Sequence, residues 1–210
     1  MGRSDPIVFS HYDFLIKNES HDSVAFLGFE KPSVFTDSIV SDNKDFYDIG
    51  LKNWDINDED WKIDKKYDLV VCTRCPYFSK NPAHFFESIR RITKKDGKFL
   101  VDWGLGDHWR FKNYKVGWLK DGEHEYAYGD QNFLWSTVWH DSFLQNPEFK
   151  KYQKWVEKLG YNNVKEAIDK EVPVVYDLND LSSHFKLEVL LLSLWEESPQ
   201  LYIMMLGQKI

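Results

Sequence analysis

The chain has 210 residues and a formal net charge of −7, with 42% hydrophobic and 29% charged residues. This composition excludes a disordered or collagen-like chain, and the length suits one globular domain. No apolar run reaches the roughly 18 residues of a membrane-spanning helix, and MGRSDP at the N-terminus is no apolar leader. We therefore expect a cytoplasmic protein without a membrane partner.

The charge is concentrated in the first third of the chain. Residues 1–70 carry 15 acidic and 8 basic residues, whereas the remainder carries equal numbers of each. Nucleic-acid-binding proteins usually present a basic face, and neither part supplies one, so we expect no nucleic-acid partner. The two cysteines imply no disulfide framework.

Short apolar runs alternate with helical patterns in the first half of the chain. The run at residues 23–29 predicts a buried strand, and Pro32 suits the first turn of a helix that reaches about Ser41. Two further short strands are predicted at residues 46–50 and 67–73.

A helix is predicted to begin at Pro82, because four apolar residues are spaced for one face: Phe85, Phe86, Ile89 and Ile92. Gly97 suits the left-handed residue after this helix, and residues 98–102 predict a fourth strand. Strand–helix–strand units of this size favour parallel pairing with right-handed crossovers. The predicted fold class is α/β, with a mostly parallel sheet between layers of helices.

The second half begins with an aromatic, loop-like segment at residues 103–143. A helix is predicted at residues 148–159, followed by strands at residues 187–195 and 201–207. The short join between these two strands predicts an antiparallel pair at the end of the sheet. Without a repeat or a linker, we expect a single domain over residues 1–210, with an insertion at about 103–143.

The middle of the chain carries a pattern typical of one enzyme family. YDLVVC at residues 67–72, FFESIRRI at 85–92 and KDGKFLV at 95–101 resemble the middle of class I S-adenosylmethionine-dependent methyltransferases. The resemblance covers about residues 20–102 and the last 25 residues. It implies a Rossmann-like three-layer fold, S-adenosylmethionine as cofactor, and methyl transfer.

The loop after the first strand departs from the family pattern. Family members have a Gly-x-Gly-x-Gly-like turn, which lets the backbone approach the methionine part of the cofactor. Here only Gly28 remains, and Phe26 stands where the family has an acid. Either Gly28, Phe29 and Glu30 still bind the cofactor, with Glu30 near its ammonium group, or the site is lost and the fold persists as a scaffold.

Three candidates for binding adenosine lie at the end of the second predicted strand and in the residues that follow it. Asp48 lies 20 residues after Gly28, where an acid can accept hydrogen bonds from ribose hydroxyls; the alternative is a turn aspartate. Trp54 is a candidate to stack on adenine, with Asp55 at its amino group. The alternatives are a packing tryptophan and a helix-capping aspartate. The short spacing also predicts that one helix of the family fold is missing or reduced to a loop.

Residues 72–75 form a C-x-x-C motif. No second such pair exists for a zinc site, and the context is not thioredoxin-like, so we predict a buried Cys72 and assign no metal site. Thr73 and Arg74 follow the carboxyl end of a strand, where open α/β sheets bind ligands. We therefore include both in the candidate cofactor site.

The aromatic segment is the candidate acceptor site. It contains five of the nine tryptophans, and we assign substrate binding to four of them: Trp103, Trp109, Trp118 and Trp135. Aromatic faces beside polar groups suit sugars or other flat hydroxylated acceptors. The alternative is a small aromatic core that keeps a long excursion ordered.

Methyl transfer to oxygen or nitrogen needs alignment of the acceptor and, usually, a base. Histidine titrates near neutral pH, and His108, preceded by Asp107, is the first candidate because it follows the fourth strand. His124 and His140 are the next candidates. Glu123 and Glu125 flank His124, so this segment either places a carboxylate behind the imidazole or binds a divalent ion together with Asp102 or Asp141. For each of them, an ordinary loop histidine is the alternative.

Three functional hypotheses remain. The leading one is an O-methyltransferase that uses S-adenosylmethionine to modify a sugar, a glycan or another small neutral molecule, as a monomer or weak homodimer. The second is a non-catalytic binding or assembly protein on the same scaffold, which the altered glycine loop favours. The third is another α/β enzyme, such as one acting on nucleotide sugars, because a fold alone does not define function.

Overall fold

A computed structural model describes residues 5–16, 19–105, 136–158, 160–172, 174–195 and 199–210. Its centre is a six-stranded sheet in the order β2-β1-β3-β4-β8-β7. The strands are β1 Ser20–Leu27, β2 Val40–Tyr47, β3 Tyr67–Cys72, β4 Thr93–Gly104, β7 Phe185–Trp195 and β8 Pro199–Lys209. The first four are mutually parallel, and β8 is antiparallel to both β4 and β7. The predicted mostly parallel sheet with a C-terminal antiparallel pair is confirmed.

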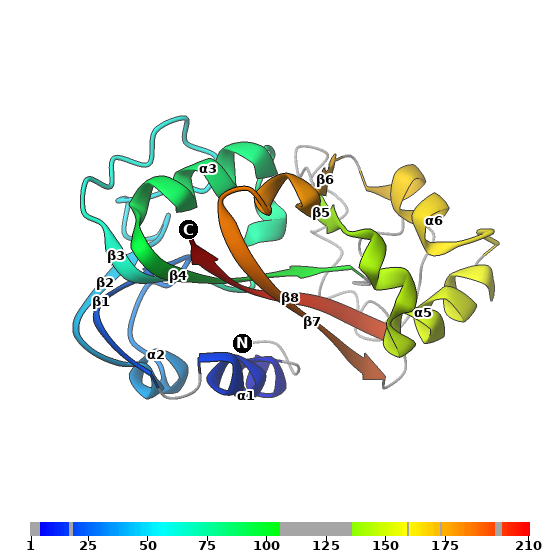
Figure 1. Cartoon of the computed structure of the whole chain (residues 1–210), viewed down its shortest axis with the longest axis horizontal. Coiled ribbons are helices and arrows are strands. Elements are labelled where there is room, and N and C mark those ends of the chain that lie inside the picture. The colour runs from blue at the N-terminus through cyan, green and yellow to red at the C-terminus, as the bar shows by residue number, and fades with distance from the viewer. Residues whose placement is uncertain (1–4, 17–18, 106–135, 159, 173, 196–198) are drawn as a thin grey trace.

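Helices cover both faces of the sheet, as predicted for a three-layer sandwich. Figure 1 shows α1 (Asp5–Ile16) and α2 (Val34–Ser38) below the sheet and α3 (Pro82–Ile92) above it. Residues of β3 alternate between two apolar cores: Val70 packs on the α3 side, whereas Leu69 and Val71 pack on the α1 side. Burial on both faces explains why this strand is an unbroken apolar run in the sequence.

The helix predicted to begin at Pro82 is present, and the residues of its predicted apolar face are buried. Asn81 caps it, because its Oδ1 accepts a hydrogen bond from the backbone N–H of His84 at 3.1 Å, and Pro82 occupies the first turn. The prediction for Gly97 is wrong: the left-handed residue is Asp96, with φ 61°, and Gly97 lies within β4. A Cβ atom on Gly97 would lie 3.0 Å from the carbonyl oxygen of Tyr67, so close approach between strands explains the glycine.

Two early elements differ from the predicted bounds. The helix predicted after Pro32 is shorter than expected: it is α2, which begins after Ser33. The side chains of Ser33 and Thr36 each accept a hydrogen bond from the other residue's backbone N–H, which forms a capping box. The second strand runs over β2, earlier than predicted, because its edge position leaves it mostly polar and apolar content alone does not reveal it. Asp48 nevertheless follows this strand directly.

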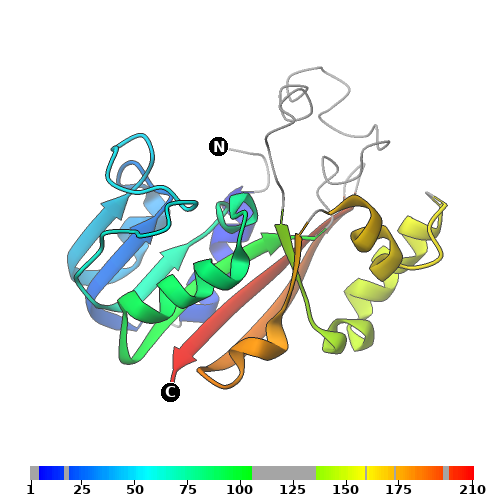
Figure 2. The same cartoon turned by 90° about the horizontal axis from the view of Figure 1, so that it is seen from above.

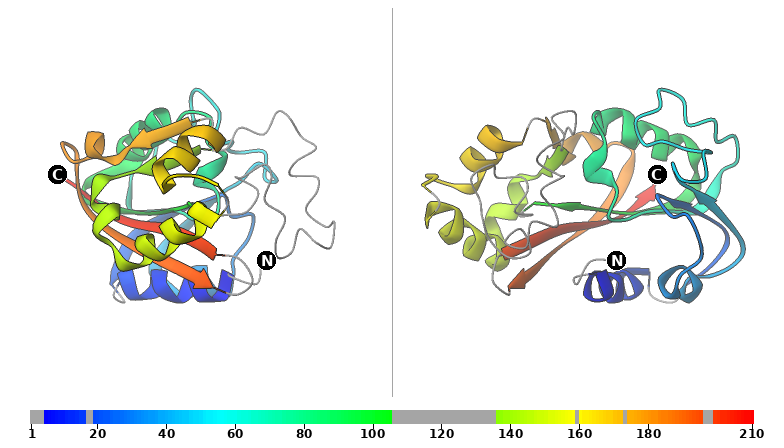
Figure 3. Two further views of the ribbon diagram at one scale, coloured as in Figure 1. Left: turned by 90° about the vertical axis from the view of Figure 1, so that its right-hand side faces the viewer. Right: turned by 180° about the vertical axis from the view of Figure 1, so that it is seen from behind.

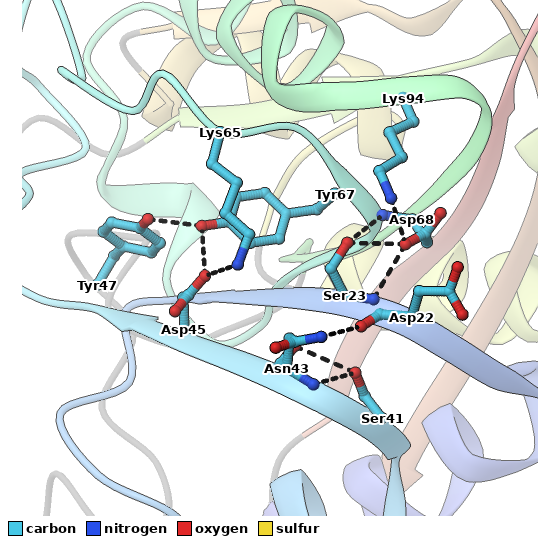
Figure 4. A network of polar contacts seen from close by, with 10 residues as sticks. All are labelled: Asp22, Ser23, Ser41, Asn43, Asp45, Tyr47, Lys65, Tyr67, Asp68 and Lys94. Carbon is cyan, nitrogen blue, oxygen red and sulfur yellow. Dashed lines mark hydrogen bonds and ion pairs between the residues drawn. The ribbon is translucent and has the colours of Figure 1, made fainter.

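No helix or strand lies between β2 and β3, which confirms that one helix is reduced to a loop. Polar side chains join the neighbouring strands of this part of the sheet (Figure 4). The Tyr67 hydroxyl lies 2.6 Å from that of Tyr47 and donates to Asp45 at 2.8 Å, and Lys65 pairs with Asp45 at 2.6 Å. Nearby, Asp68 accepts hydrogen bonds from the hydroxyl of Ser23 and from Lys94.

Between β4 and β7, the chain forms a small lobe beside one end of the sheet (Figure 2). The left view of Figure 3 is taken from the side on which this lobe lies. Its elements are β5 Ser136–Trp139, η4 Asp141–Gln145, α5 Pro147–Lys158, α6 Val164–Glu171, β6 Val174–Asp177 and η5 Leu178–Leu181. α5 is close to its prediction, but the parallel pair β5–β6 was not predicted. In the described part of the chain, no helix is long and apolar enough to cross a membrane.

Candidate cofactor site and comparison with known folds

The carboxyl ends of β1, β2, β3 and β4 meet at one edge of the sheet because these strands are parallel. This edge is where open α/β sheets bind their ligands. It carries Gly28 after β1, Asp48 after β2, and Thr73 and Arg74 after β3. The predicted cofactor residues therefore come together on adjacent strand ends.

Gly28 makes a turn that no other residue fits well. Its φ is 79°, and a Cβ atom there would lie 3.0 Å from both Cβ and Sγ of Cys75. The backbone N–H of Gly28 donates to the carbonyl oxygen of Tyr47 at 2.7 Å. Gly28, the single glycine that remains in the altered loop, thus keeps the ends of β1, β2 and β3 in contact. Phe29, next in the chain, packs against Phe26 and Phe35.

Two carboxylates converge beside this turn. A Cβ atom on Gly50 would lie 2.9 Å from Oε1 of Glu30 and 3.0 Å from Oδ1 of Asp48. Asp48 Oδ1 accepts the backbone N–H of Gly50 at 2.7 Å, so it forms a turn as the simpler interpretation predicted. The Asn53 side chain accepts the N–H of Asp48 and donates to the carbonyl oxygen of Phe46, which fixes the loop. Glu30 therefore lies beside Asp48, on the β2 side of Gly28.

A pocket of about 350 Å³ lies in the loop after Asp48. It is lined by Ile49, Lys52, Asn53, Trp54, Asp55, Asp58, Trp61 and Lys62. Trp54 and Trp61 are buried and meet edge to face, with ring centroids 5.2 Å apart. Lys52 and Lys62 both have positive φ, of 56° and 50°. An aromatic pair with polar neighbours suits a flat heteroaromatic ring that has hydrogen-bonding edges.

Trp54 and Asp55 both line the pocket, and each also has a structural role in its own loop. Trp54 is a packing residue with 5% exposure, yet its Nε1 is buried and has no hydrogen-bond partner among the described residues. Asp55 accepts the backbone N–H of Asn57 at 2.9 Å, so it shapes a turn rather than capping a helix. Trp61 was not predicted, although a second tryptophan seven residues after Trp54 was a visible signal.

The turn after β3 contains a buried polar cluster. Arg74 has a φ of 60°, and its backbone N–H donates to Oδ1 of Asp102 at 2.6 Å. Asp102 has no exposed surface, and the hydroxyl of Tyr12 donates to its Oδ2 at 2.5 Å. The Arg74 guanidinium lies over the ring of Tyr202, 4.8 Å from its centroid. Burial and the neighbouring Asp102 raise the pKa of the Tyr12 hydroxyl well above its ordinary value.

Sequence reasoning considered Asp102 only as an alternative ligand of a divalent ion and assigned no site role to Tyr12. The available signal was an aspartate inside the apolar run of β4, because a buried carboxylate needs hydrogen-bond donors. Thr73 is 3% exposed, and its hydroxyl has no hydrogen-bond partner within the described part of the chain. Cys72 is fully buried, as predicted; burial, and then a hydrogen bond with Cys75, raise the pKa of its thiol.

Most of the candidate acceptor and catalytic residues lie outside the described residues: Asp107, His108, Trp109, Trp118, His124 and Trp135. Trp103 is fully buried against Phe85 and Phe86, and its Nε1 donates to Ser136 at 3.3 Å. This placement fits the alternative of an aromatic core. His140 caps η4, because its Nδ1 accepts the backbone N–H of Ser142 at 3.1 Å.

No family model matches the chain, and no curated protein matches it. Solved structures do match. The N-methyltransferase NodS from Bradyrhizobium japonicum WM9, crystallised with S-adenosylhomocysteine, is 8% identical, with 99% of this chain and 88% of that chain covered and a TM-score of 0.52. A putative methyltransferase from Bacillus halodurans C-125 is 10% identical (96% and 98% covered, TM-score 0.46). The YcgJ protein from Bacillus subtilis is 9% identical (97% and 98% covered, TM-score 0.48).

The likeness to NodS extends over nearly the whole chain and concerns the fold alone, because the identity is so low. It agrees with the strand order, the parallel pairing of the first four strands and the antiparallel pair at the end of the sheet. The chain therefore has the Rossmann-like fold of class I S-adenosylmethionine-dependent methyltransferases.

Proposed function

We propose that this chain binds S-adenosylmethionine and is a methyltransferase. One observation carries the proposal: a pocket with an aromatic floor, two carboxylates and a left-handed glycine follow one another along the carboxyl ends of β2 and β1. Adenine, ribose and an amino-acid chain are joined in the same order in the cofactor. The fold shared with NodS supports the proposal.

The residues of this edge fit the adenosine part of the cofactor. The pocket would hold adenine, and the buried Nε1 of Trp54 is a donor that lacks a partner among the described residues. Asp48, whose backbone N–H donates to the pocket residue Asn53, would accept hydrogen bonds from the ribose hydroxyls. Exposed Ile49 would cover one face of the ring.

The methionine part would lie along the turns after β1 and β3. Gly28 would allow close backbone approach, Glu30 would supply a carboxylate for the ammonium group, and Thr73 and Arg74, which directly follow β3, are proposed as the remaining contacts. When bound, S-adenosylmethionine supplies an electrophilic methyl group. The tasks of the chain are to align the acceptor with that methyl group, exclude water and accept a proton.

The acceptor side of the proposal is O-methylation of a sugar, a glycan or another small hydroxylated molecule. Its support is the aromatic composition of residues 103–143 and the absence of an overall basic charge. His108 is proposed as the base, because it follows β4 in the chain by a few residues. The proton of the acceptor hydroxyl would pass to its imidazole.

The cofactor site is tested by measuring the binding of S-adenosylhomocysteine to the full chain and to two variants. Asp48→Ala should weaken binding about 10-fold or more, since hydrogen bonds to a charged group contribute about 1.5–3 kcal/mol. Asp64→Ala is the matched control: an exposed aspartate of the same loop, whose replacement should leave the affinity unchanged. Equal affinity in all three proteins would remove Asp48 from the site.

A second candidate function has one specific observation in its favour. Only Gly28 remains of the glycine turn, and the helix that follows it, α2, has five residues. A protein that retained the fold but lost the cofactor would be a binding or assembly scaffold. A folded wild-type chain that binds neither S-adenosylmethionine nor S-adenosylhomocysteine would favour this candidate.

A further inference from the structure

The two cysteines of the chain lie in contact at the carboxyl end of β3. Cys72 is the last residue of β3 and is fully buried, whereas Cys75 is half-buried. Both are free cysteines, and a hydrogen bond joins their thiols. Arg74, which lies between them, has a φ of 60° and bends the chain. The C-x-x-C motif, for which no redox role was predicted, therefore brings two free thiols together.

The turn that carries the motif is held by hydrogen bonds on both sides. The backbone N–H of Arg74 donates to Oδ1 of the buried Asp102 at 2.6 Å. The carbonyl oxygen of Cys75 accepts the backbone N–H of Phe78 at 3.0 Å. Because this backbone is already ordered while the cysteines are reduced, closing a disulfide between them costs little further conformational entropy.

The unequal burial of the two thiols gives them different parts in an oxidation. A small peroxide can reach Cys75, because this residue is half-buried rather than enclosed. Burial raises the pKa of the Cys72 thiol, and the hydrogen bond with Cys75 raises it further, so Cys72 is protonated in the reduced chain. Cys75 is therefore the residue that reacts with the oxidant, and Cys72 is the residue that closes the disulfide.

We infer that Cys72 and Cys75 form a reversible disulfide that switches the cofactor site off when a peroxide is present. The Cys75 sulfur attacks hydrogen peroxide: an S–O bond forms, the O–O bond breaks, and the leaving hydroxide takes the thiol proton to become water. The Cys72 sulfur then attacks the sulfenic acid on Cys75. The S–S bond forms, the S–O bond breaks, and the second hydroxide leaves as water with the Cys72 proton. The thiols lose two electrons, and the peroxide gains them.

The disulfide would act on the cofactor site through Gly28. A Cβ atom on Gly28 would lie 3.0 Å from both Cβ and Sγ of Cys75, so the turn after β1 packs directly on this side chain. A disulfide holds its sulfur atoms about 2.05 Å apart, closer than a hydrogen bond between thiols does. Since Cys72 is enclosed in the core, Cys75 must move, and the Gly28 turn loses this contact. The effect on the cofactor rests on the proposed function, whereas the disulfide itself does not.

The first measurement counts thiols, which is simple because the chain has two cysteines. The full chain is treated with hydrogen peroxide, then with catalase, then unfolded in the presence of a maleimide and weighed by mass spectrometry. The wild type should lose both maleimide additions and regain both after treatment with dithiothreitol. Cys75→Ser should keep its single addition, because Cys72 is buried. Two additions retained by the oxidised wild type, or a disulfide between two chains, would overturn the inference.

The second measurement is calorimetry of the same samples with S-adenosylhomocysteine. The oxidised wild type should bind about 10-fold more weakly than the reduced wild type, or worse, and dithiothreitol should restore the affinity. Cys75→Ser, and Cys75→Ala as a second variant, should have the same affinity before and after peroxide, which also controls for oxidation elsewhere in the chain.

The outcomes separate the switch from the proposed function. A disulfide that leaves the affinity unchanged would overturn the switch and leave the proposed function intact. A reduced wild-type chain that binds no S-adenosylhomocysteine would overturn the proposed function and the switch together, whatever the thiol count shows.

Discussion

Cys75 packs on Gly28 so closely that a Cβ atom on the glycine would lie 3.0 Å from both Cβ and Sγ of the cysteine. The contact joins the turn after β1 to the turn after β3, the two segments proposed to hold the methionine part of the cofactor. Because Gly28 also has a φ of 79°, a side chain there would suffer from both strain and overlap.

Gly28→Ala should therefore destabilise the chain by about 2–4 kcal/mol, combining the strain of a positive φ with overpacking. Urea denaturation measures this loss. Gly160→Ala is the matched control: Gly160 has a φ of 93°, but among the described residues, its two chain neighbours apart, no heavy atom lies within 4 Å of the added Cβ, so it reports the strain alone. Equal losses in both variants would show that the Cys75 contact contributes nothing.

Gly207→Ala tests close packing inside the sheet. A Cβ atom on Gly207, in β8, would lie 2.2 Å from the ring of Phe99 in β4. The variant should lose about 3 kcal/mol or more of unfolding free energy, because the buried ring has little room to move. Adding Phe99→Leu should recover part of that loss. A Gly207→Ala variant as stable as the wild type would contradict the packing described here.

Tyr12→Phe tests the hydrogen bond that joins α1 to β4. Removing the hydroxyl leaves one oxygen of the buried Asp102 without this donor, which should cost about 1–3 kcal/mol. Denaturant unfolding at neutral pH measures the loss. No change in stability would mean that this hydrogen bond makes no net contribution.

Tyr12→Phe should also differ from the wild type in how its stability depends on alkaline pH. Burial raises the pKa of Tyr12, so its stabilising contribution is fully present below about pH 10, the ordinary tyrosine pKa, and is lost as pH rises further. The wild-type melting temperature should therefore fall above that pH, and Tyr12→Phe should fall less steeply. Tyr67, whose pKa is raised by burial and by its bonds to Tyr47 and Asp45, contributes with the same sign in both proteins.

His108→Ala tests the proposed base once an acceptor has been found. Turnover should fall by about 100-fold or more, the usual contribution of general-base catalysis, with little change in cofactor affinity. His184→Ala is a suitable control because His184 is an exposed histidine between η5 and β7 and is no candidate base; its loss should leave turnover unchanged. Undiminished turnover in His108→Ala would remove it as the base.

Elements set by local sequence were predictable. α3 follows from its apolar spacing and from Asn81 and Pro82, β3 from its apolar run, and the β7–β8 pair from its short join. The polar edge strand β2 was misplaced because edge strands need no apolar face. The β5–β6 pair was missed because two four-residue strands are joined only by contacts distant in sequence.

For the candidate site, the sequence predicted those residues that follow strand ends. Gly28, Asp48, Thr73 and Arg74 were predicted in this way, and the structure brings them to one edge of the sheet. The pairing of Tyr12 with Asp102, 90 residues apart, depends on α1 packing across the sheet, which no local pattern encodes. The left-handed conformation of Arg74, a bulky residue, is likewise a tertiary effect.

The most direct test of this account is calorimetry of the purified wild-type chain with S-adenosylmethionine and with S-adenosylhomocysteine. The account predicts one binding site with micromolar affinity for each ligand, despite the single glycine of the loop. A folded sample that binds neither ligand would contradict it and would leave a methyltransferase fold without its cofactor.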